Sequence, residues 1–447
     1  RTGAPGAYSE ASVRGGAPRE IGVYLDGVPL GTASGGGVDI GKVPLAMLRE
    51  IDIYKGTRPL RYCGRNTGGV VDLRSRPGTD MVSLGGELGS FAYGKGNFLL
   101  RRTRGRASHH LAVGIARAAN NHPFLSDNGT SYNPHDDTII SKRNNDYSSF
   151  SALYSASLRL AAESNVTAYA GYDRFEQGIF RHDLAAGLEP QNERYSGQTA
   201  RGSVRFGRPL GPRGRIDTEV QGRYKTTIYD DPDGKQKLHE RFPFVEGALS
   251  GTYAPWAWLI LTGRVATDFE RWDSRNRVRP AAGPRPFADR LTVRVGAELD
   301  INGNDRVMSK LRYVHALEHD RTNSTGTVSQ IHIESTVRET THFPDIETEV
   351  QWRALSFLSL FAGGRHAVRS PSFYEKYGRG AVYAGNPRLK PETRLEYDIG
   401  AEMGWEHVNS SVAFFQGVTR NKIKSIMQAQ SVYTPLNYAD VRHRGVE

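Results

Sequence analysis

The chain has 447 residues, 50 of them glycine and 21 tyrosine, and its formal net charge is +11. No run of about 18 apolar residues occurs, which excludes a protein that crosses a membrane with helices, and the single Cys63 excludes an internal disulfide. The one dense basic cluster, 101–106, has no interleaved aromatic residues that would stack on bases, so we expect no nucleic-acid binding.

The first 80 residues alternate short apolar runs with glycine-rich turns. Three strands and one short helical segment are expected there, in the order 21–25, 43–48 (helical), 50–54 and 68–73. The pair Asp26-Gly27 closes the first strand with a turn. Residues 1–80 are therefore predicted to form a small mixed α/β domain.

After residue 80 the pattern changes to a repeated alternation with period two. In segment 396–405 the residues of one face are Tyr397, Ile399, Ala401, Met403 and Trp405. Segments 165–174, 291–301 and 346–353 repeat this pattern. About ten residues with one apolar and one polar face suit a strand that crosses a membrane. The pattern predicts a large antiparallel membrane β-barrel over 81–447, with a soluble β-sandwich or propeller as the alternative.

Aromatic residues and loops fit the barrel interpretation. The tryptophans stand at or near segment ends, as expected for girdles at the membrane surfaces: Trp256, Trp258, Trp272, Trp352 and Trp405. The polar stretches 122–145 and 229–241 are predicted to be long loops on one side of the barrel.

The two ends of the sequence lack the features of a complete exported barrel. Residues 1–20 contain no apolar segment of a signal peptide. Residues 441–447 are charged and carry no terminal aromatic residue. We therefore expect the chain to be truncated at both ends, with the last strands of the barrel missing.

Five motifs carry a family resemblance. Residues 25–30, 43–56 and 62–73 resemble the plug domain of TonB-dependent outer-membrane receptors in order and spacing. Residues 369–377 and 385–392 resemble a late barrel signature of the same family.

The resemblance implies a barrel of about 22 strands when complete, with an α/β plug inside. It implies active import across the bacterial outer membrane rather than enzymatic activity. The partners are then the TonB energy-coupling protein, a small-molecule nutrient complex and outer-membrane lipid, and the receptor is expected to be a monomer. A ferric siderophore is the first choice of substrate. Cobalamin, haem and glycans stay open as substrates. A passive porin or adhesin is the alternative class of protein. An outer-membrane hydrolase is a further alternative, but the sequence shows no catalytic constellation to support it.

The resemblance also implies a substrate loop at the apex of the plug. Its candidate residues are Leu30, Gly31, Thr32, Ala33 and Ser34. The sequence departs from the family pattern nearby, because Cys63 replaces a glycine and arginines replace small residues at Arg58, Arg61 and Arg65. Cys63 is interpreted as a buried apolar residue, with a reactive thiol as the alternative.

Two acidic clusters have oxygen ligands of the kind that calcium prefers. They are Asp127 with Asp136 and Asp137, and Asp230, Asp231 and Asp233. Solvated loops are the competing interpretation, and no other cofactor is expected beyond iron or cobalt in the transported ligand. The run His315–His319 matches a zinc-peptidase motif that requires a helix, but its surroundings alternate as a strand, so we expect neither a zinc site nor a catalytic centre.

Overall fold

The computed structural model describes most of the chain. The described residues are 6, 9–64, 66–75, 79–128, 130, 132–180, 192–278, 287–304, 306–322, 325–328, 331–334, 337–378, 383–405, 407–429 and 432–447.

A four-stranded mixed sheet forms the centre of the N-terminal domain. Its strands follow the order β2 (Val28–Pro29), β1 (Ile21–Leu25), β4 (Gly69–Arg74) and β3 (Glu50–Tyr54). Strands β1 and β4 are parallel, and the other pairs are antiparallel. The 3-10 helix η1 (Pro18–Glu20) precedes β1, η2 (Ile40–Lys42) and η3 (Leu45–Met47) connect β2 to β3, and η4 (Leu60–Tyr62) connects β3 to β4. The three predicted strands and the helical turn near residue 45 are confirmed.

The turn between β1 and β2 shows how local sequence sets this fold. Asp26 and Gly27 both have positive φ angles, 50° and 87°. Such a pair matches the twist of a two-residue hairpin, and Asp-Gly adopts it at little cost. The Asp26 carboxylate also accepts a 2.9 Å hydrogen bond from the Ser75 N–H, which ties the turn to the end of β4.

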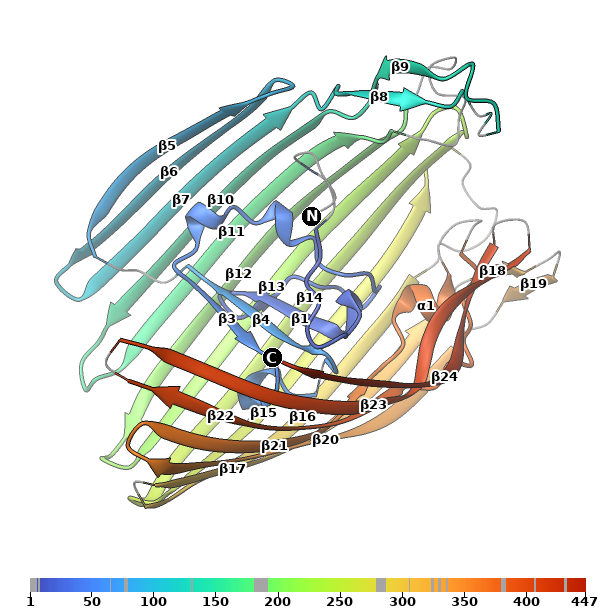
Figure 1. The fold of residues 1–447 in the computed structure, drawn as a ribbon. Helices are drawn as coiled ribbons and strands as arrows, with labels where there is room; N and C mark the ends of the chain where they lie inside the picture. Colours follow the sequence, from blue (N-terminus) through green and yellow to red (C-terminus); the bar gives the residue numbers. More distant parts are fainter. Residues whose placement is uncertain are drawn as a thin grey trace.

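Most of the remaining described chain forms a 16-stranded antiparallel sheet that curves around the N-terminal domain (Figure 1). In chain order the strands are β5 (Met81–Gly89), β6 (Tyr93–Arg104), β7 (Ala107–Ala118), β10 (Tyr147–Arg159), β11 (Asn165–Gly178), β12 (Arg194–Leu210), β13 (Gly214–Asp231), β14 (Gln236–Trp256), β15 (Leu259–Asn276), β16 (Phe287–Asn304), β17 (Val307–Thr322), β20 (Val337–Leu355), β21 (Leu358–Arg369), β22 (Glu392–Gly404), β23 (Asn409–Ala429) and β24 (Val432–Val446). Each strand pairs with the next, and β5 and β24 lie at the two edges.

Alternation in the sheet places apolar side chains outside and charged side chains inside. On β22, the exposed fractions of Leu395, Tyr397 and Ile399 are 58%, 49% and 60%, whereas those of Arg394 and Glu396 are 1% and 3%. A water-soluble protein buries the apolar set instead. The inverted arrangement is that of a barrel wall whose outer face lies against lipid. None of the helices in the described part of the chain is long and apolar enough to cross a membrane.

Aromatic side chains cluster at the ends of strands, where short turns connect them. The rings of Trp256 and Trp258 stack at 5.3 Å beside the turn between β14 and β15, and those of Phe357 and Trp405 stack at 5.2 Å. Trp272 is an exception, and its predicted place in a girdle is wrong. It is buried on the inner face of β15, because one register position decides which side of a strand a residue takes.

The connections at the opposite ends of the strands are longer and carry the small elements. They hold the hairpin of β8 (Pro123–Ser126) and β9 (Thr138–Ser141), the hairpin of β18 (Thr325–Val328) and β19 (Ile331–Glu334), and α1 (Phe373–Tyr377). The prediction of a long loop over 229–241 is wrong. Strands β13 and β14 continue through it and pair up to Asp231 and Gln236. The polar composition there reflects strands that extend beyond the apolar part of the wall.

The core of the N-terminal domain is completed by the barrel wall. Val28 and Val71 belong to one buried cluster with Leu99 of β6, Leu153 of β10 and Tyr169 of β11. Each fully buried apolar side chain of this size contributes about 1.5–3 kcal/mol. The domain therefore gains part of its stability only when it is seated inside the wall.

Candidate functional site

The loop at the apex of the N-terminal domain faces a cavity of about 550 Å³ between that domain and the wall. Leu30, Gly31 and Thr32 line this cavity, opposite strands β10 to β14. Arg223 of β13 holds the loop in place by donating hydrogen bonds to the carbonyl oxygens of Pro29, at 2.6 Å, and Gly31. The site is thus built jointly by the N-terminal domain and the wall.

Aromatic rings make up much of the apolar lining of this cavity, which we call the apical cavity. They come from the five strands β10 to β14 and from α1: Tyr147, Phe175, Tyr195, Tyr229, Phe242 and Tyr374. Aromatic faces bind flat or cationic groups and pack closely against ring-bearing ligands.

Positive charge outweighs negative charge in the apical cavity. Basic lining residues are Lys42, Arg174, Arg201, Arg223 and Lys225, and acidic ones are Asp39, Asp173 and Glu240. The Lys42 ammonium lies 3.3 Å from Asp39 and 3.5 Å from the centre of the Phe175 ring. Burial lowers the pKa of Lys42, and Asp39 opposes that shift only in part.

Lys225 of β13 is the second ammonium group of the cavity. It lies 5.7 Å from the centre of the Phe242 ring and within electrostatic range of both Lys42 and Glu240. Among the residues that the structure describes, no carboxylate lies within ion-pair distance of Lys225. An anion in the cavity would therefore meet two ammonium groups, one from each domain.

The other two candidate loop residues contact a different partner. The carbonyl oxygen of Ala33 accepts a 2.8 Å hydrogen bond from the N–H of Phe373, and that of Ser34 accepts a 3.0 Å bond from the N–H of Tyr374. Both donors belong to α1 in the connection between β21 and β22. The predicted loop is thus divided, with three residues at the cavity and two on α1.

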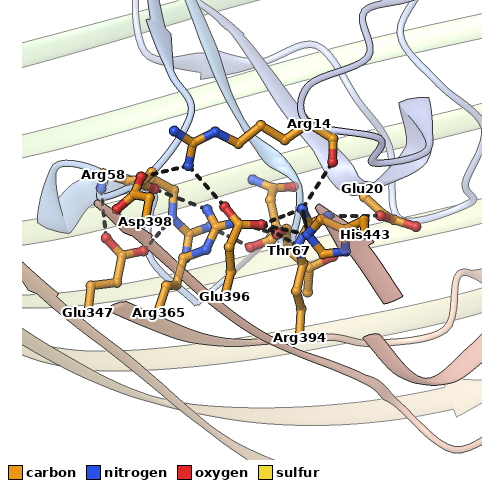
Figure 2. Close-up of polar contacts among 12 residues, drawn as sticks. Arg14, Glu20, Arg58, Thr67, Glu347, Arg365, Arg394, Glu396, Asp398 and His443 are labelled. Atoms are coloured by element: carbon orange, nitrogen blue, oxygen red, sulfur yellow. Dashed lines mark hydrogen bonds and ion pairs between the residues drawn. The ribbon is translucent and has the colours of Figure 1, made fainter. Parts of the chain in front are cut away.

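On the opposite side of the N-terminal domain, buried ion pairs join it to the wall (Figure 2). The Arg58 side chain is fully buried and donates to Glu347 at 2.6 Å and Asp345 at 2.9 Å. Burial alone would lower the pKa of Arg58, but these two carboxylates raise it. Arg58, a departure from the family pattern, is therefore an anchor between the domain and β20.

Further contacts extend this anchor across β21 and β22. Arg14 donates to Asp398 at 2.7 Å and to Glu396 at 3.3 Å. Arg365 donates to the carbonyl oxygens of Gly56, at 3.1 Å, and Thr67, at 2.8 Å. Figure 2 shows these side chains converging between the N-terminal domain and the red-brown strands of the wall.

The remaining departures have simple structural roles. Arg61 forms a 3.2 Å ion pair with Glu219 of β13. Cys63 packs against Leu60 and Val314, and burial raises the pKa of its thiol. A low thiolate content favours the interpretation as a buried apolar residue over a reactive thiol. Arg65 lies outside the described residues.

The acidic cluster at 230–233 is engaged in local contacts. Asp230 contacts the Lys237 ammonium, and Asp231 accepts a 2.8 Å hydrogen bond from the N–H of Gly234 in the turn. Within the described ranges, no group of three or more His, Cys, Asp or Glu side chains is placed to hold a metal ion. Calcium binding by Asp230, Asp231 and Asp233, or by the cluster at 127–137, stays a prediction.

The zinc-peptidase pattern falls on strand β17. His315 contacts His342 on the exposed face of the wall, at 3.3 Å between ring nitrogens. Glu318 points to the inner face, where it accepts a hydrogen bond from the Ser370 hydroxyl. The motif residues therefore lie on opposite faces, as alternation on a strand requires.

Sequence reasoning missed the wall residues of the apical cavity and the contact with α1. Arg223, Lys225 and Glu240 occupy inward positions of alternating strands, and that pattern could have marked them as interior. Which strands bring them together depends on the register of β13 with β14, where Lys225 pairs with Phe242. The sequence contains no local signal for that register.

Comparison with known proteins gives consistent results. A profile described as "TonB dependent receptor-like, beta-barrel" matches residues 86–447, and a profile of the TonB-dependent receptor plug domain matches residues 1–70. The vitamin B12 transporter BtuB of Vibrio vulnificus is 28% identical over 87 residues, which is 20% of this chain and 14% of that transporter. The chain thus matches only a small part of that curated relative.

Two solved structures share the fold at low sequence identity. The hemophore receptor HasR of Serratia marcescens, in complex with its hemophore HasA and heme, has a TM-score of 0.71 at 12% identity over 96% of this chain and 71% of its own. The copper transporter OprC has a TM-score of 0.77 at 13% identity over 97% of this chain and 69% of its own. Both family profiles, in the order that the two domains take in the fold, show that the chain belongs to the TonB-dependent receptor family, with a plug domain inside a β-barrel wall.

Proposed function

We propose that this protein is a receptor of the bacterial outer membrane that binds a scarce nutrient and imports it with energy from the TonB complex. The substrate that suits the site best is a ferric siderophore. The observation that carries this proposal is the apical cavity, which combines aromatic walls with an excess of cationic groups beneath the long loops.

The chemistry of a ferric siderophore matches that lining. Iron chelators bind through negatively charged oxygens, and many carry aromatic rings, so the complex is a compact anion with flat faces. Lys42 and Lys225 would pair with its charge, and Phe175 and Tyr195 would pack on its rings. Gly31 and Thr32 would contact it with backbone groups and a small hydroxyl.

The position of the plug supports import with energy input over passive flow. The plug lies within the curve of the wall (Figure 1) and is fixed there by an apolar core and by buried ion pairs. A passive porin or an adhesin has no use for such a domain. Movement of the plug has to break those contacts, and the TonB protein is the proposed source of the energy. We also propose a monomer in contact with outer-membrane lipid.

Cobalamin is the second candidate, because 87 residues of the chain match a vitamin B12 transporter at 28% identity. Haem and glycans are further candidates within the family. A ligand without negative charge would use the aromatic walls of the apical cavity but would form no ion pair with Lys225, which makes it less suitable.

The test is ligand titration of the full-length receptor in detergent. A ferric tris-catecholate complex, cobalamin and haem are added in turn, and tryptophan quenching is followed at low and high salt. Saturable submicromolar binding of the ferric complex, weakened by salt, supports the proposal. Binding of cobalamin alone would replace the substrate, and binding of none of them by a folded barrel would contradict this group of substrates.

A further inference from the structure

The connection between β21 and β22 carries a short segment, 370–378, that bridges the apex of the plug and the wall. We call it the strap. Its helix α1 starts with a capping box, in which Ser372 and Glu375 satisfy each other's backbone N–H groups. The sequence of the strap itself therefore favours this helical turn, independently of contacts with other elements.

The strap fits closely against the plug. Besides the bonds from Phe373 and Tyr374 to the carbonyl oxygens of Ala33 and Ser34, Gly35 lies directly beneath Ser372. A Cβ atom on Gly35 would stand 2.4 Å from the Ser372 hydroxyl, and the φ angle of Gly35 is +98°. Any movement of the strap therefore moves the apex of the plug or breaks this contact.

Toward the apical cavity, the strap is held by one carboxylate of the wall. The Tyr374 hydroxyl donates to Oε1 of Glu240 at 2.8 Å, and Nε1 of Trp272 donates to the same oxygen at 3.1 Å. The rings of Tyr374 and Trp272 meet edge to face at 5.6 Å. Glu240 is only 1% exposed and lines the cavity.

The ends of the strap are fixed independently of the cavity. Lys376 donates to Asp320 at 3.1 Å and to Glu339 at 2.7 Å. Arg369, at the end of β21, donates to both oxygens of Glu375. Because these bonds lie away from the cavity lining, the contact between Tyr374 and Glu240 is the point at which a ligand reaches the strap.

A second cavity, of about 600 Å³, shares Tyr374 with the first one. The two cavities also have Gly36 and Gly37 of the apex in common. Tyr374 and the apex of the plug therefore separate two spaces, and a change in their contact alters both.

We propose that the strap senses occupancy of the apical cavity and controls how firmly it holds the apex of the plug. This rests on the proposed function, because it requires an anionic ligand in the cavity. The ligand pairs with Lys225, and its negative charge repels the Glu240 carboxylate. Glu240 turns away, Tyr374 loses its acceptor and donates to the ligand instead, and the strap releases Ala33 and Ser34.

Hydrogen–deuterium exchange of the full-length receptor tests this directly, because the amides of Phe373 and Tyr374 are the donors to the plug. In wild type, a ferric tris-catecholate complex is expected to speed exchange in 370–378 by about threefold or more. This is the change expected when one hydrogen bond no longer protects the segment. The Tyr374→Phe variant keeps the ring and removes the hydroxyl. Without ligand its exchange is expected to be as fast as in ligand-bound wild type, and ligand adds no further change.

The matched control is Tyr377→Phe, which removes a hydroxyl from the same helix. The Tyr377 hydroxyl has no hydrogen-bond partner among the described residues. It is expected to behave as wild type. Unchanged ligand-free exchange in Tyr374→Phe, or a full ligand response in that variant, overturns the proposal. If the ferric complex does not bind to wild type, the proposed substrate is wrong, and the ligand-free comparison of the two variants still decides whether Tyr374 holds the strap on the plug.

Discussion

The plug meets the wall in two ways that differ in chemistry. Toward β6, β7, β10 and β11 the contact is apolar and buried, built from residues such as Leu99 and Leu153. Toward β20, β21 and β22 it consists of buried arginines and carboxylates (Figure 2). The stabilisation from apolar packing decreases in proportion to the apolar area that is exposed. A charged side chain in an ion pair, in contrast, can exchange its partner for water or for another charge. If the plug moves during the proposed import, we therefore expect its release to begin at the charged side.

The largest expected effect comes from breaking the charged side. Arg58→Ala leaves Glu347 and Asp345 buried without their cation, which costs about 3–5 kcal/mol. We expect faster exchange of the plug amides in 57–64 and a lower unfolding temperature of the full-length receptor. Arg74→Ala is the control, because its pairs with Asp52 and Asp72 lie within the plug. Equal effects of the two variants would show that Arg58 does not seat the plug.

On the apolar side, Leu153→Ala removes a wall side chain from the shared core. A cost of about 2–5 kcal/mol is expected, because a cavity remains where the side chain was. Exchange should rise in β1 and β4 and not in 57–64. The control is Leu249→Ala on the outer face of β14, which is 48% exposed to the membrane side. Loss of protection on both sides of the plug at once would mean that the two contacts form one unit.

The contact at the apex is expected to be weaker than either side. Gly35→Ala places a methyl group against Ser372 at a positive φ angle, a strain of about 1–3 kcal/mol. The expected result is faster exchange in 370–378 with little change in unfolding temperature. Gly36→Ala has a similar φ angle but open space around the new Cβ atom, so it isolates the effect of strain alone. Identical exchange in the two variants would show that the contact between Gly35 and Ser372 does not hold the strap on the plug.

A smaller effect is expected from acidification of the strap. Burial raises the pKa of Glu375, but Arg369 and Arg19 more than offset this, so the pKa lies below the ordinary value of 4.5. A carboxylate with a lowered pKa in the folded state adds stability that is complete above the unfolded value and is lost as the pH falls through the folded value. Protection of the amides in 370–378, taken relative to their intrinsic exchange rate at each pH, should therefore fall below pH 4.5. Glu375→Gln should remove that dependence, and a variant that keeps it would assign the titration to another group.

The sequence predicts the strands of the two domains better than it predicts the residues of the site. Alternation in 396–405 predicts the orientation of β22 correctly, because a period of two fixes which residues share a face. The plug strands follow from apolar runs and from the Asp26-Gly27 turn. The wall residues of the apical cavity do not follow, because Lys225 and Glu240 meet only through pairing between strands. Trp272 was mispredicted because its place near a segment end does not show which face of β15 it takes. The stretch 229–241 was mispredicted because local composition does not show where a strand leaves the membrane.

The central claim is that the cationic apical cavity binds an anionic nutrient complex. The most direct measurement is the affinity of the full-length receptor for a ferric tris-catecholate complex in wild type and in Lys225→Met, at low and high salt. We expect binding to weaken about tenfold or more in the variant, the value of one buried charge-assisted contact. Lys235→Met, in the exposed turn between β13 and β14, should leave it unchanged. Tight binding that neither salt nor Lys225→Met alters would contradict the claim.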